Sequence, residues 1–394
     1  MPRFEPFAAL RYSPMLSLDD VAAPPYDVLS DADVDALLAR HPRNIVAIDV
    51  PRDVDGPDRY ALAASRLAEW VQEGTLVRDA SPSFTLYRMK FTDEAGTTRE
   101  TVGVLGALEV VDEGAGGVLP HERTTPKAKS DRLDLTRATD TNLSPVWGLS
   151  LTPGLTDLLR APAEPVGACH DEHGVLHTVE RVTDPERVAA ISAAVGSNPV
   201  LIADGHHRYA ISRTFRDERR AAGGDDAAEL TLTYVAELVE EQLSIDAIHR
   251  LYRGVSADDL LAIFAPLFDL SEAGPVTASF AGEVVERGAL CLVRPNGTGV
   301  WLTPKPEAFV DVRALDGAYL EHALADRDID VTYQHGVQHV IDIVGAGGAS
   351  TGVLIRPTSI VEIRRTADER LLMPPKSTFF TPKLRTGPVL RPLH

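Results

Sequence analysis

One junction in the sequence limits the possible folds more than any other feature. Residues 199–203 (PVLIA) carry no polar side chain and are followed at once by the turn residues Asp204 and Gly205. A short apolar run bounded by a turn is typical of a β-strand that is buried on both faces. Residues 206–220 then have the pattern of a helix. A buried strand that leads through a turn into a helix predicts an α/β fold.

The same alternation of strands and helices continues on both sides of this junction. Helices are expected over 31–40, 60–72, 130–139, 186–195, 258–268 and 318–325, and strands over 44–50, 83–91, 100–110, 144–151, 229–239 and 352–355. Ser30 is placed to cap the first helix, and Leu62, Leu67 and Val71 form the expected apolar stripe of the second. The pattern predicts a mixed α/β (α+β) chain.

The length of the chain indicates more than one domain. It has 394 residues, whereas a typical domain has about 100–200. We predict an N-terminal α/β region over 1–112, a core over 113–253 that contains the junction, and a C-terminal α/β region over 254–394. The sequence leaves the oligomeric state open.

Composition and charge exclude several classes of protein. A hydrophobic fraction of 44% with 25% charged residues is ordinary for a globular protein and too apolar for a disordered chain. No apolar run approaches the roughly 18 residues that a spanning helix needs, so we expect no membrane partner. The first residues lack a secretory pattern and the two cysteines cannot build a disulfide framework, so we expect a cytoplasmic protein. The net charge of −19 repels a phosphate backbone and argues against DNA as a partner.

The expected helix after the junction begins with chemistry that suits an anion. The first turn of a helix offers free backbone N–H groups and a positive dipole end. Gly205 lets the backbone approach a ligand, and Arg208 is able to hold a phosphate with two hydrogen bonds. His206 and His207 are candidates for proton transfer, and Asp204 for capping the helix, binding a metal or orienting a histidine. The alternative is an ordinary surface helix.

Two further polar segments hold four of the six lysines in the chain. In residues 121–135 (HERTTPKAKSDRLDL), Glu122 is a candidate general base, and Lys127, Lys129 and Arg132 are candidate phosphate contacts. In residues 374–387 (PPKSTFFTPKLRTG), the candidate phosphate contacts are Lys376, Ser377, Thr378 and Lys383. The alternatives are a solvated loop for the first segment and a surface-packed arm for the second.

A third segment, residues 23–30 (APPYDVLS), offers a fixed carboxylate. Two prolines stiffen the approach to Asp27, which makes it a candidate catalytic acid or base; a plain helix-entry loop is the alternative. Asn44 and Asp49 are weaker candidates.

Cys169, His170, His173 and His177 have the composition of a metal site. The tight turn between them separates two expected strands, whose alternating side chains point to opposite faces. We therefore expect no metal site there, and we expect Cys291 to be a buried thiol.

The motifs together resemble a bacterial and archaeal family of conserved proteins of unknown function. The matching stretches are RFEPFAALRY at 3–12, APPYDV at 23–28, NIVAID at 44–49, HERT at 121–124, KSDRLDL and ATDTNLSPV within 129–146, ADGHHRYA at 203–210, IHR at 248–250 and MPPKSTFFTPKLRTG at 373–387. The strand–DGHHR–helix unit also resembles the nucleotide-site motif of the ParB/sulfiredoxin-like superfamily, which includes an ADP-dependent free serine kinase. That resemblance implies a ParB/sulfiredoxin-like nucleotide-binding core in which Gly205, His206, His207 and Arg208 hold phosphate.

The function that these features favour is a nucleotide-dependent phosphotransferase. Its expected cofactors are ATP or ADP with Mg²⁺, and its expected acceptor is a small polar metabolite such as free serine. Phosphoryl transfer needs positioned hydrogen-bond donors and a base, which the polar segments supply. The alternatives are a hydrolase that removes phosphate from a similar metabolite, a nucleotide-sensing protein without turnover, and a structural or adaptor protein whose polar loops bind no ligand.

Overall fold

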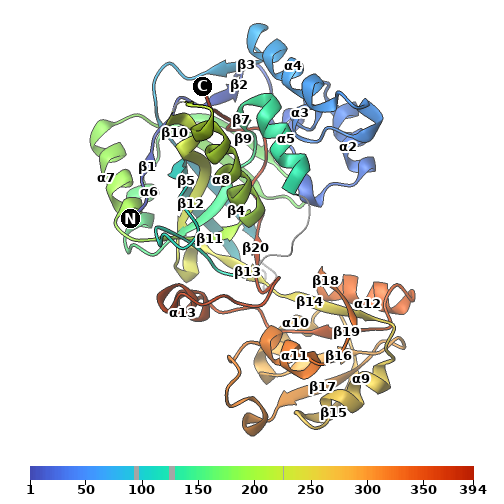
Figure 1. Cartoon of the computed structure of the whole chain (residues 1–394). Coiled ribbons are helices and arrows are strands. Elements are labelled where there is room, and N and C mark those ends of the chain that lie inside the picture. The colour runs from blue at the N-terminus through green and yellow to red at the C-terminus, as the bar shows by residue number, and fades with distance from the viewer. Residues whose placement is uncertain (93–96, 124–128, 225) are drawn as a thin grey trace. The chain divides into compact units, whose positions relative to one another are not determined.

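The computed structural model describes residues 1–92, 97–123, 129–224 and 226–394, and the mixed α/β class is confirmed (Figure 1). The chain divides into two compact units. Unit 1 comprises Met1–Pro120, Thr124–Ser244 and Pro382–His394, and unit 2 comprises His121–Arg123 and Ile245–Thr381. The three regions expected from the sequence, 1–112, 113–253 and 254–394, stay a prediction.

Helices and strands are interspersed along the whole chain. The helices are α1 (Leu18–Val21), α2 (Asp31–Arg40), α3 (Val46–Asp49), α4 (Arg59–Gln72), α5 (Lys129–Thr139), α6 (Leu155–Arg160), α7 (Pro185–Gly196), α8 (His206–Ala221), α9 (Ala257–Phe264), α10 (Phe280–Arg287), α11 (Asp316–Leu324), α12 (Val337–Gly345) and α13 (Ile360–Glu369). The strands are β1 (Phe4–Glu5), β2 (Leu10–Tyr12), β3 (Leu76–Arg78), β4 (Phe84–Thr92), β5 (Thr98–Glu109), β6 (Val118–Pro120), β7 (Thr141–Asn142), β8 (Val146–Ser150), β9 (Glu164–His170), β10 (Leu176–Val182), β11 (Val200–Asp204), β12 (Leu230–Glu237), β13 (Ser244–Asp246), β14 (Ile248–Arg253), β15 (Phe268–Pro275), β16 (Leu290–Val293), β17 (Thr298–Pro304), β18 (Asp330–His335), β19 (Thr351–Leu354), β20 (Phe379–Thr381) and β21 (Arg391–Pro392). Within the described residues, none of these helices combines the length and apolar character that crossing a bilayer requires.

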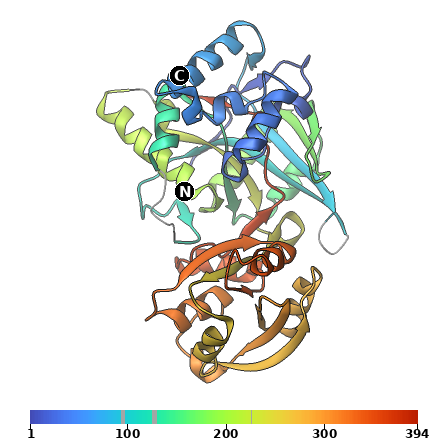
Figure 2. The ribbon, with the colours of Figure 1, turned by 90° about the vertical axis from the view of Figure 1, so that its right-hand side faces the viewer.

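A large mixed sheet forms the centre of unit 1. Its strands lie in the order β6-β11-β8-β12-β5-β4-β10-β9, and β1 pairs with β5. β11 runs parallel to β6 and antiparallel to β8, while β4 and β5 form the long antiparallel pair drawn in light blue in Figure 2. One face of the sheet packs against α6, α7 and Tyr209 of α8 around buried residues such as Val104, Ile191 and Val200. The apolar strand expected before the junction is therefore confirmed as a core strand.

The N-terminal helices of unit 1 enclose a second apolar cluster. α2 begins at the expected position, where Ser30 and Asp33 form a reciprocal capping box. In α4 the expected stripe is wrong in two positions, because Leu62 and Val71 are 41% and 44% exposed. The buried face consists instead of Ala63, Leu67 and Trp70, which follow the spacing of one helix face.

The strand expected over 44–50 is wrong, because Val46–Asp49 forms the short helix α3. An apolar run of this length is compatible with either a buried strand or a buried helix. Hydrogen bonds of Asn44 stabilise the start of this helix. Its side-chain oxygen accepts from the Val46 N–H, and its amide donates to the carbonyl oxygens of Asp20 and Ala22. Asn44 is thus a buried structural residue that places Asp49 at the end of α3.

Unit 2 is built on an antiparallel sheet with the strand order β15-β17-β16-β19-β14-β18. Its strands alternate between two apolar layers, as pleated strands do. On β16, Cys291 and Val293 pack against α10 and α12, whereas Leu290 and Leu292 pack toward α9 and α11. Cys291 is a buried free thiol, as expected.

The helix expected over 258–268 ends early, at Phe264, and Phe268 opens β15. Pro266 accounts for the difference, because proline lacks the backbone N–H that would continue the hydrogen bonds of the helix.

Candidate functional site

The start of α8 carries the side chains that the sequence singled out. Gly205 is the residue that caps the helix, with φ of +84°, in the left-handed region that glycine tolerates best. No side chain caps the helix, so the expectation that Asp204 does so is wrong. A Cβ atom on Gly205 would lie 3.0 Å from Arg208 Nε. The glycine therefore also makes room for the arginine.

The carboxylate of Asp204 is held between two cations. Its Oδ2 accepts from Arg208 Nη2 at 2.5 Å, and its Oδ1 accepts from Lys383 Nζ at 3.2 Å. Burial alone raises the pKa of Asp204, but the charges of Lys383 and Arg208 outweigh it and leave that pKa well below its usual range. Asp204 is consequently ionised at neutral pH and fixes the position of both cations.

Arg208 is held in place from a second direction. Its Nη1 donates to the carbonyl oxygen of Pro145, and its side chain is only 14% exposed. Burial acts to lower the pKa of Arg208, and the nearby acids Asp204, Asp27 and Asp49 more than offset this, so its pKa is raised. The guanidinium is therefore a permanent, oriented positive charge.

A second arginine, Arg132 of α5, belongs to the same cluster. Its Nη1 donates to Asp49 Oδ1 at 2.8 Å, and its guanidinium carbon lies 3.7 Å from the centre of the Tyr26 ring, a cation–π contact. Asp49 is only 1% exposed, and burial raises its pKa although Arg132 acts in the opposite direction. The cluster thus holds one buried carboxylate that gains a proton more readily than an ordinary aspartate.

These groups surround a small polar cavity. Arg132, Arg208 and Asp49 line a space of about 40 Å³, together with polar groups of Asn142 and Ser212. This volume is enough for a water molecule or a single small polar group. Within the part of the chain that the structure describes, the buried Arg132 Nε finds no hydrogen-bond acceptor. Asp131 Oδ2 lies 3.6 Å from this nitrogen, which is an ion pair but is beyond hydrogen-bond distance. Buried donors normally have a hydrogen-bond partner, so this N–H can still donate to a bound water or ligand.

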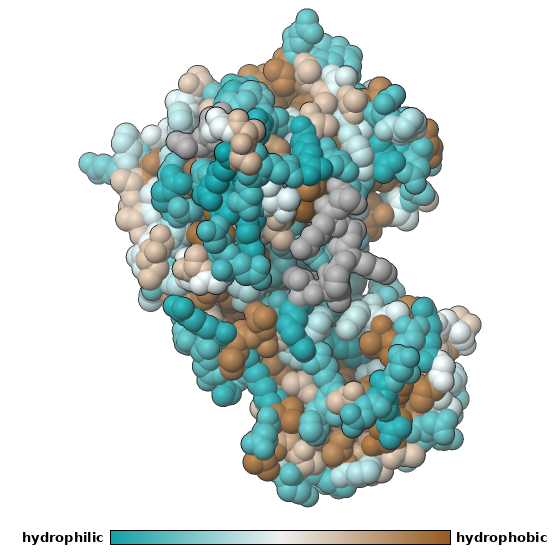
Figure 3. Space-filling view, in the orientation of Figure 1, coloured by the Kyte–Doolittle hydropathy of each residue, from teal (hydrophilic) through white to brown (hydrophobic). Residues whose placement is uncertain are grey.

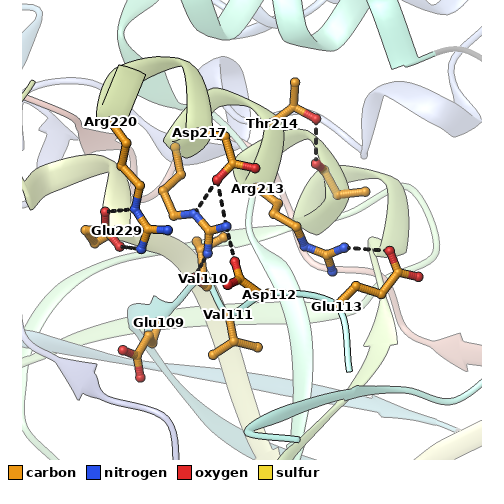
Figure 4. A network of polar contacts seen from close by, with 12 residues as sticks. Glu109, Val110, Val111, Asp112, Glu113, Arg213, Thr214, Asp217, Arg220 and Glu229 are labelled. Carbon is orange, nitrogen blue, oxygen red and sulfur yellow. Dashed lines mark hydrogen bonds and ion pairs between the residues drawn. The ribbon is translucent and has the colours of Figure 1, made fainter. Parts of the chain in front are cut away.

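Three further arginines of α8 fix the helix to neighbouring segments through hydrogen bonds and ion pairs. Arg213 donates to Glu113, and Arg220 makes two hydrogen bonds to Glu229 (Figure 4). Arg216, which is 2% exposed, donates to the Val110 carbonyl oxygen and to Asp112. The surface over α8 is accordingly mostly hydrophilic (Figure 3). The helix start is therefore presented by a firmly anchored element.

The other candidates of unit 1 lie near or beyond this cluster. His206 and His207 are half-buried in the first turn of α8, and His206 acts electrostatically on Asp204. Asp27 is exposed on the short turn Tyr26–Val28 and acts electrostatically on Arg208 and Asp49. Lys129 opens α5, and Lys127 lies outside the described residues. The roles assigned to these residues from the sequence stay predictions.

The remaining candidates belong to unit 2 and contact one another. Glu122 Oε2 accepts from the Ser377 N–H at 3.1 Å, and His121 Nε2 lies 2.7 Å from Thr378 Oγ1. The Ser377 hydroxyl donates to the Pro374 carbonyl oxygen, and Lys376 has φ of +57°. These contacts join two segments far apart in sequence and fix the turn around Lys376. The expected phosphate contacts thus divide between the units, with Arg132, Asp204, Gly205, Arg208 and Lys383 in unit 1 and Lys376, Ser377 and Thr378 in unit 2.

The stretch around residues 169–177 contains no metal-binding arrangement. β9 and β10 flank the expected turn, and the buried His177 contacts Tyr87 Oη and Asp171 Oδ2 at 3.0 and 3.3 Å. Among the described residues, no group of three or more histidine, cysteine, aspartate or glutamate side chains is arranged to hold a metal ion.

Asp49 and Tyr26 are the residues whose importance the sequence did not indicate. Asp49 was only a weaker candidate, and the expected strand placed it wrongly. The one available signal was an acidic residue directly after an apolar segment. Tyr26 precedes Asp27 in the motif that was singled out, but only the fold brings its ring onto Arg132.

The chain is similar to one described protein family and, at low identity, to several solved structures. A family described as "Protein of unknown function (DUF1015)" matches residues 4–318, and no curated protein matches the chain in sequence. Among solved structures, a free serine kinase in complex with AMP is similar at 13% identity and a TM-score of 0.38, over 70% of this chain and 87% of the other. A conserved hypothetical protein from Pyrococcus furiosus has 14% identity and a TM-score of 0.37, over 69% of this chain and 92% of its own. C-terminally truncated SbnI from Staphylococcus aureus has 14% identity and a TM-score of 0.40, with coverages of 73% and 87%.

Proposed function

The chain belongs to the DUF1015 family of proteins of unknown function, and we propose that this member is a nucleotide-dependent phosphotransferase that acts on a small polar metabolite. The observation that carries the proposal is the convergence of Arg132 and Arg208, from two different helices, on one polar cavity beside the buried Asp49. Arg132 pairs with Asp49 and Arg208 pairs with Asp204, so the cavity presents two oriented guanidinium groups whose charges are each partly balanced by a carboxylate. Such a cavity favours an anion over a neutral ligand.

In the proposed site the transferred phosphate contacts Arg132 and Arg208. Phosphoryl transfer depends mainly on positioning and on the neutralisation of charge, which two arginines supply. The buried Nε of Arg132 is a donor for a phosphate oxygen. The N–H groups of the first turn of α8, which follows Gly205, add positive potential, and Lys383 holds the carboxylate of Asp204 in place. Because the cavity holds only a small group, the body of the nucleotide extends beyond it.

Asp49 is the proposed general base that accepts the proton of the acceptor hydroxyl. Its burial and raised pKa suit a group that must take up a proton near neutral pH. Glu122, His206, His207 and Asp27 stay as alternative proposals for this role. Asp204 is less suited to it, because two cations hold its carboxylate in the ionised form.

The proposed nucleotide is ATP or ADP. Free serine is the first acceptor to test, since the DGHHR unit resembles a group that includes a free serine kinase. Mg²⁺ does not fit the described residues as a preformed protein site, because Asp204 and Asp49 are already engaged with cations. The predicted Mg²⁺ would therefore arrive with the nucleotide phosphates, and no step is assigned to it.

A hydrolase is the second proposal, and one observation favours it. The cavity of about 40 Å³ accommodates a water molecule next to Asp49. With water as acceptor, the same arginines and the same base would remove phosphate from a phospho-metabolite.

Two measurements test these proposals. The first is thermal unfolding of the full chain with ATP, ADP, CTP, GTP and pyrophosphate, with and without Mg²⁺; a nucleotide that binds the native chain raises the Tm. The second is mass spectrometry of a metabolite panel that includes serine and phosphoserine after incubation with protein and nucleotide. A phosphorylated acceptor supports the transferase, loss of phosphate supports the hydrolase, and a Tm shift without turnover supports the nucleotide sensor. Absence of any Tm shift and any turnover rejects all three.

A further inference from the structure

Unit 2 contains a pocket that the proposed phosphotransferase does not use. It has a volume of about 330 Å³ and lies among β14, α11, α13 and the segment after β19. This size is within the range of pockets that hold small metabolites, roughly 300–1,000 Å³. Four charged residues from separate elements line it: Arg250, Asp316, Arg356 and Glu362.

Both acidic residues of the pocket already have cationic partners. Asp316, which is 5% exposed, accepts from Arg356 through its Nε, its Nη2 and its backbone N–H. Glu362 accepts from Arg313 Nε at 3.1 Å. The pairs Asp316–Arg356 and Glu362–Arg313 each have no net charge. The pocket therefore retains the charge of Arg250.

Arg250 is a buried cation with only neutral groups against it. It is 5% exposed, and its terminal nitrogens donate to the carbonyl oxygens of Ile248, Lys376 and Pro375. Among the described residues, no carboxylate forms an ion pair with its guanidinium; Glu122 and Glu321, whose ion pairs are with His121 and Arg123, act on it only electrostatically. A buried charge without a counter-charge is costly, and an anion in the pocket would remove that cost.

The surroundings of Arg250 hold it in a defined position. Gly317 lies so close that a Cβ atom there would be 3.1 Å from Arg250 Nη2. On another side, Lys376 adopts a left-handed conformation, φ of +57°, that is uncommon for a residue with a side chain. The carbonyl oxygens of this turn are the ones that accept from Arg250. The arginine is thus fixed by a glycine contact and by a constrained turn.

The other walls of the pocket suit the remainder of a small organic molecule. Leu315, Ile355 and Pro357 contribute apolar surface, and Thr358 and Ser359 contribute polar groups. Ser359 also caps α13, whose positive end therefore belongs to the pocket. An apolar wall with a few polar groups and one fixed charge is the usual composition of a metabolite site.

We propose that this pocket of unit 2 binds a small organic carboxylate, with the carboxylate on Arg250 and a short body against Leu315, Ile355 and Pro357. One uncompensated positive charge matches one carboxylate, whereas a phosphate monoester brings a second negative charge that the pocket does not balance. This site is independent of the phosphate cavity of unit 1, because none of its residues belongs to that unit.

The test uses the full chain and isothermal titration with lactate, pyruvate and glycerate as probes. Glycerol is the neutral control and glycerol 3-phosphate is the phosphate arm. The expected result is saturable binding of at least one carboxylate and none of glycerol. Binding of glycerol 3-phosphate alone, or of none of the carboxylates, overturns the proposal.

Variants assign the binding to the pocket. Arg250→Met should weaken carboxylate binding at least tenfold, while Arg287→Ala, an arginine of α10 that stacks on Trp301, should leave it unchanged. Arg208→Ala should also leave it unchanged, which separates this site from unit 1. Should Arg250→Met fail to fold, Gly317→Ala provides the second variant, because its Cβ displaces the guanidinium. Equal carboxylate affinity in the wild type and in the Arg250 or Gly317 variant rejects the assignment.

Discussion

Lys383 Nζ donates to Asp204 Oδ1 at 3.2 Å although the two residues are 179 positions apart in the sequence. The contact joins the C-terminal segment of unit 1 to the turn before α8. Together with Arg208 it holds the carboxylate of Asp204 from both oxygens. The orientation of Arg208, the proposed phosphate-binding arginine, therefore depends on Lys383, a residue close to the C-terminus in sequence.

Replacing Lys383 by methionine should destabilise unit 1 by about 1 kcal/mol at neutral pH, the scale of a partly exposed ion pair. The folded pKa of Asp204 is depressed, so its contribution to stability is present above the unfolded pKa of about 4 and is lost as pH falls. The difference in the free energy of unfolding between variant and wild type should therefore be largest above about pH 5 and shrink below about pH 3. Urea unfolding at several pH values measures it. Lys90→Met, on the exposed side of β4, is the control; a difference that does not depend on pH would contradict the role given to Asp204.

Replacing Gly205 by alanine should both strain the backbone and displace Arg208. The matched control is Gly223→Ala, where φ is +69° but no atom lies within 4 Å of the added Cβ. Both variants bear the cost of a left-handed residue, about 1–2 kcal/mol, and only Gly205→Ala adds a contact with Arg208 Nε. Chemical denaturation should therefore show a larger decrease in the free energy of unfolding for Gly205→Ala than for Gly223→Ala. Equal losses would mean that Arg208 moves aside without cost.

Replacing Arg208 by alanine should weaken nucleotide binding by about 2–3 kcal/mol, the value of a charge-assisted hydrogen bond. Arg213→Ala is the matched control, because Arg213 lies on the same helix and pairs with Glu113. Titration of the bound nucleotide into each variant measures the effect. If both variants bind equally well, phosphate does not contact Arg208.

Replacing Asp49 by asparagine should slow turnover by about 10²–10⁴-fold, the usual contribution of a general base, with much less effect on nucleotide binding. Because burial raises the pKa of Asp49, the wild-type rate should fall with decreasing pH at values above the ordinary aspartate range of about 4. The pH–rate profile of the wild type and the rate of Asp49→Asn give the two readouts. Glu122→Gln is the comparison variant. A rate loss in Glu122→Gln with none in Asp49→Asn would move the base to Glu122.

The junction around Gly205 was predictable from the sequence because its signals are local. An apolar run, a glycine that adopts positive φ and a basic helix start each act within a few residues, and they agree with one another. β11, the turn and α8 accordingly lie where they were expected. The expected strand over 44–50 failed because its apolar run carries no period that separates a strand from a helix.

The composition of the cavity was beyond local reasoning. Asp49, Arg132 and Arg208 come from three distant segments, and only tertiary packing brings them to one cavity. Arg250 shows the same limit, since the IHR motif gave no sign that its arginine would be buried without a carboxylate. The sequence identified reactive residues but could not indicate which of them share a site.

The segment Pro382–His394 has a consequence for how the chain is made. Unit 1 includes this segment, with Leu390 fully buried and Arg391 paired in β21 to β7, yet a ribosome synthesises all of Ile245–Thr381 first. The N-terminal part of unit 1 can therefore complete its packing around Leu390 only after translation has passed through the whole intervening unit. Premature termination anywhere before Lys383 would release a chain in which Asp204 lacks one of its two cations.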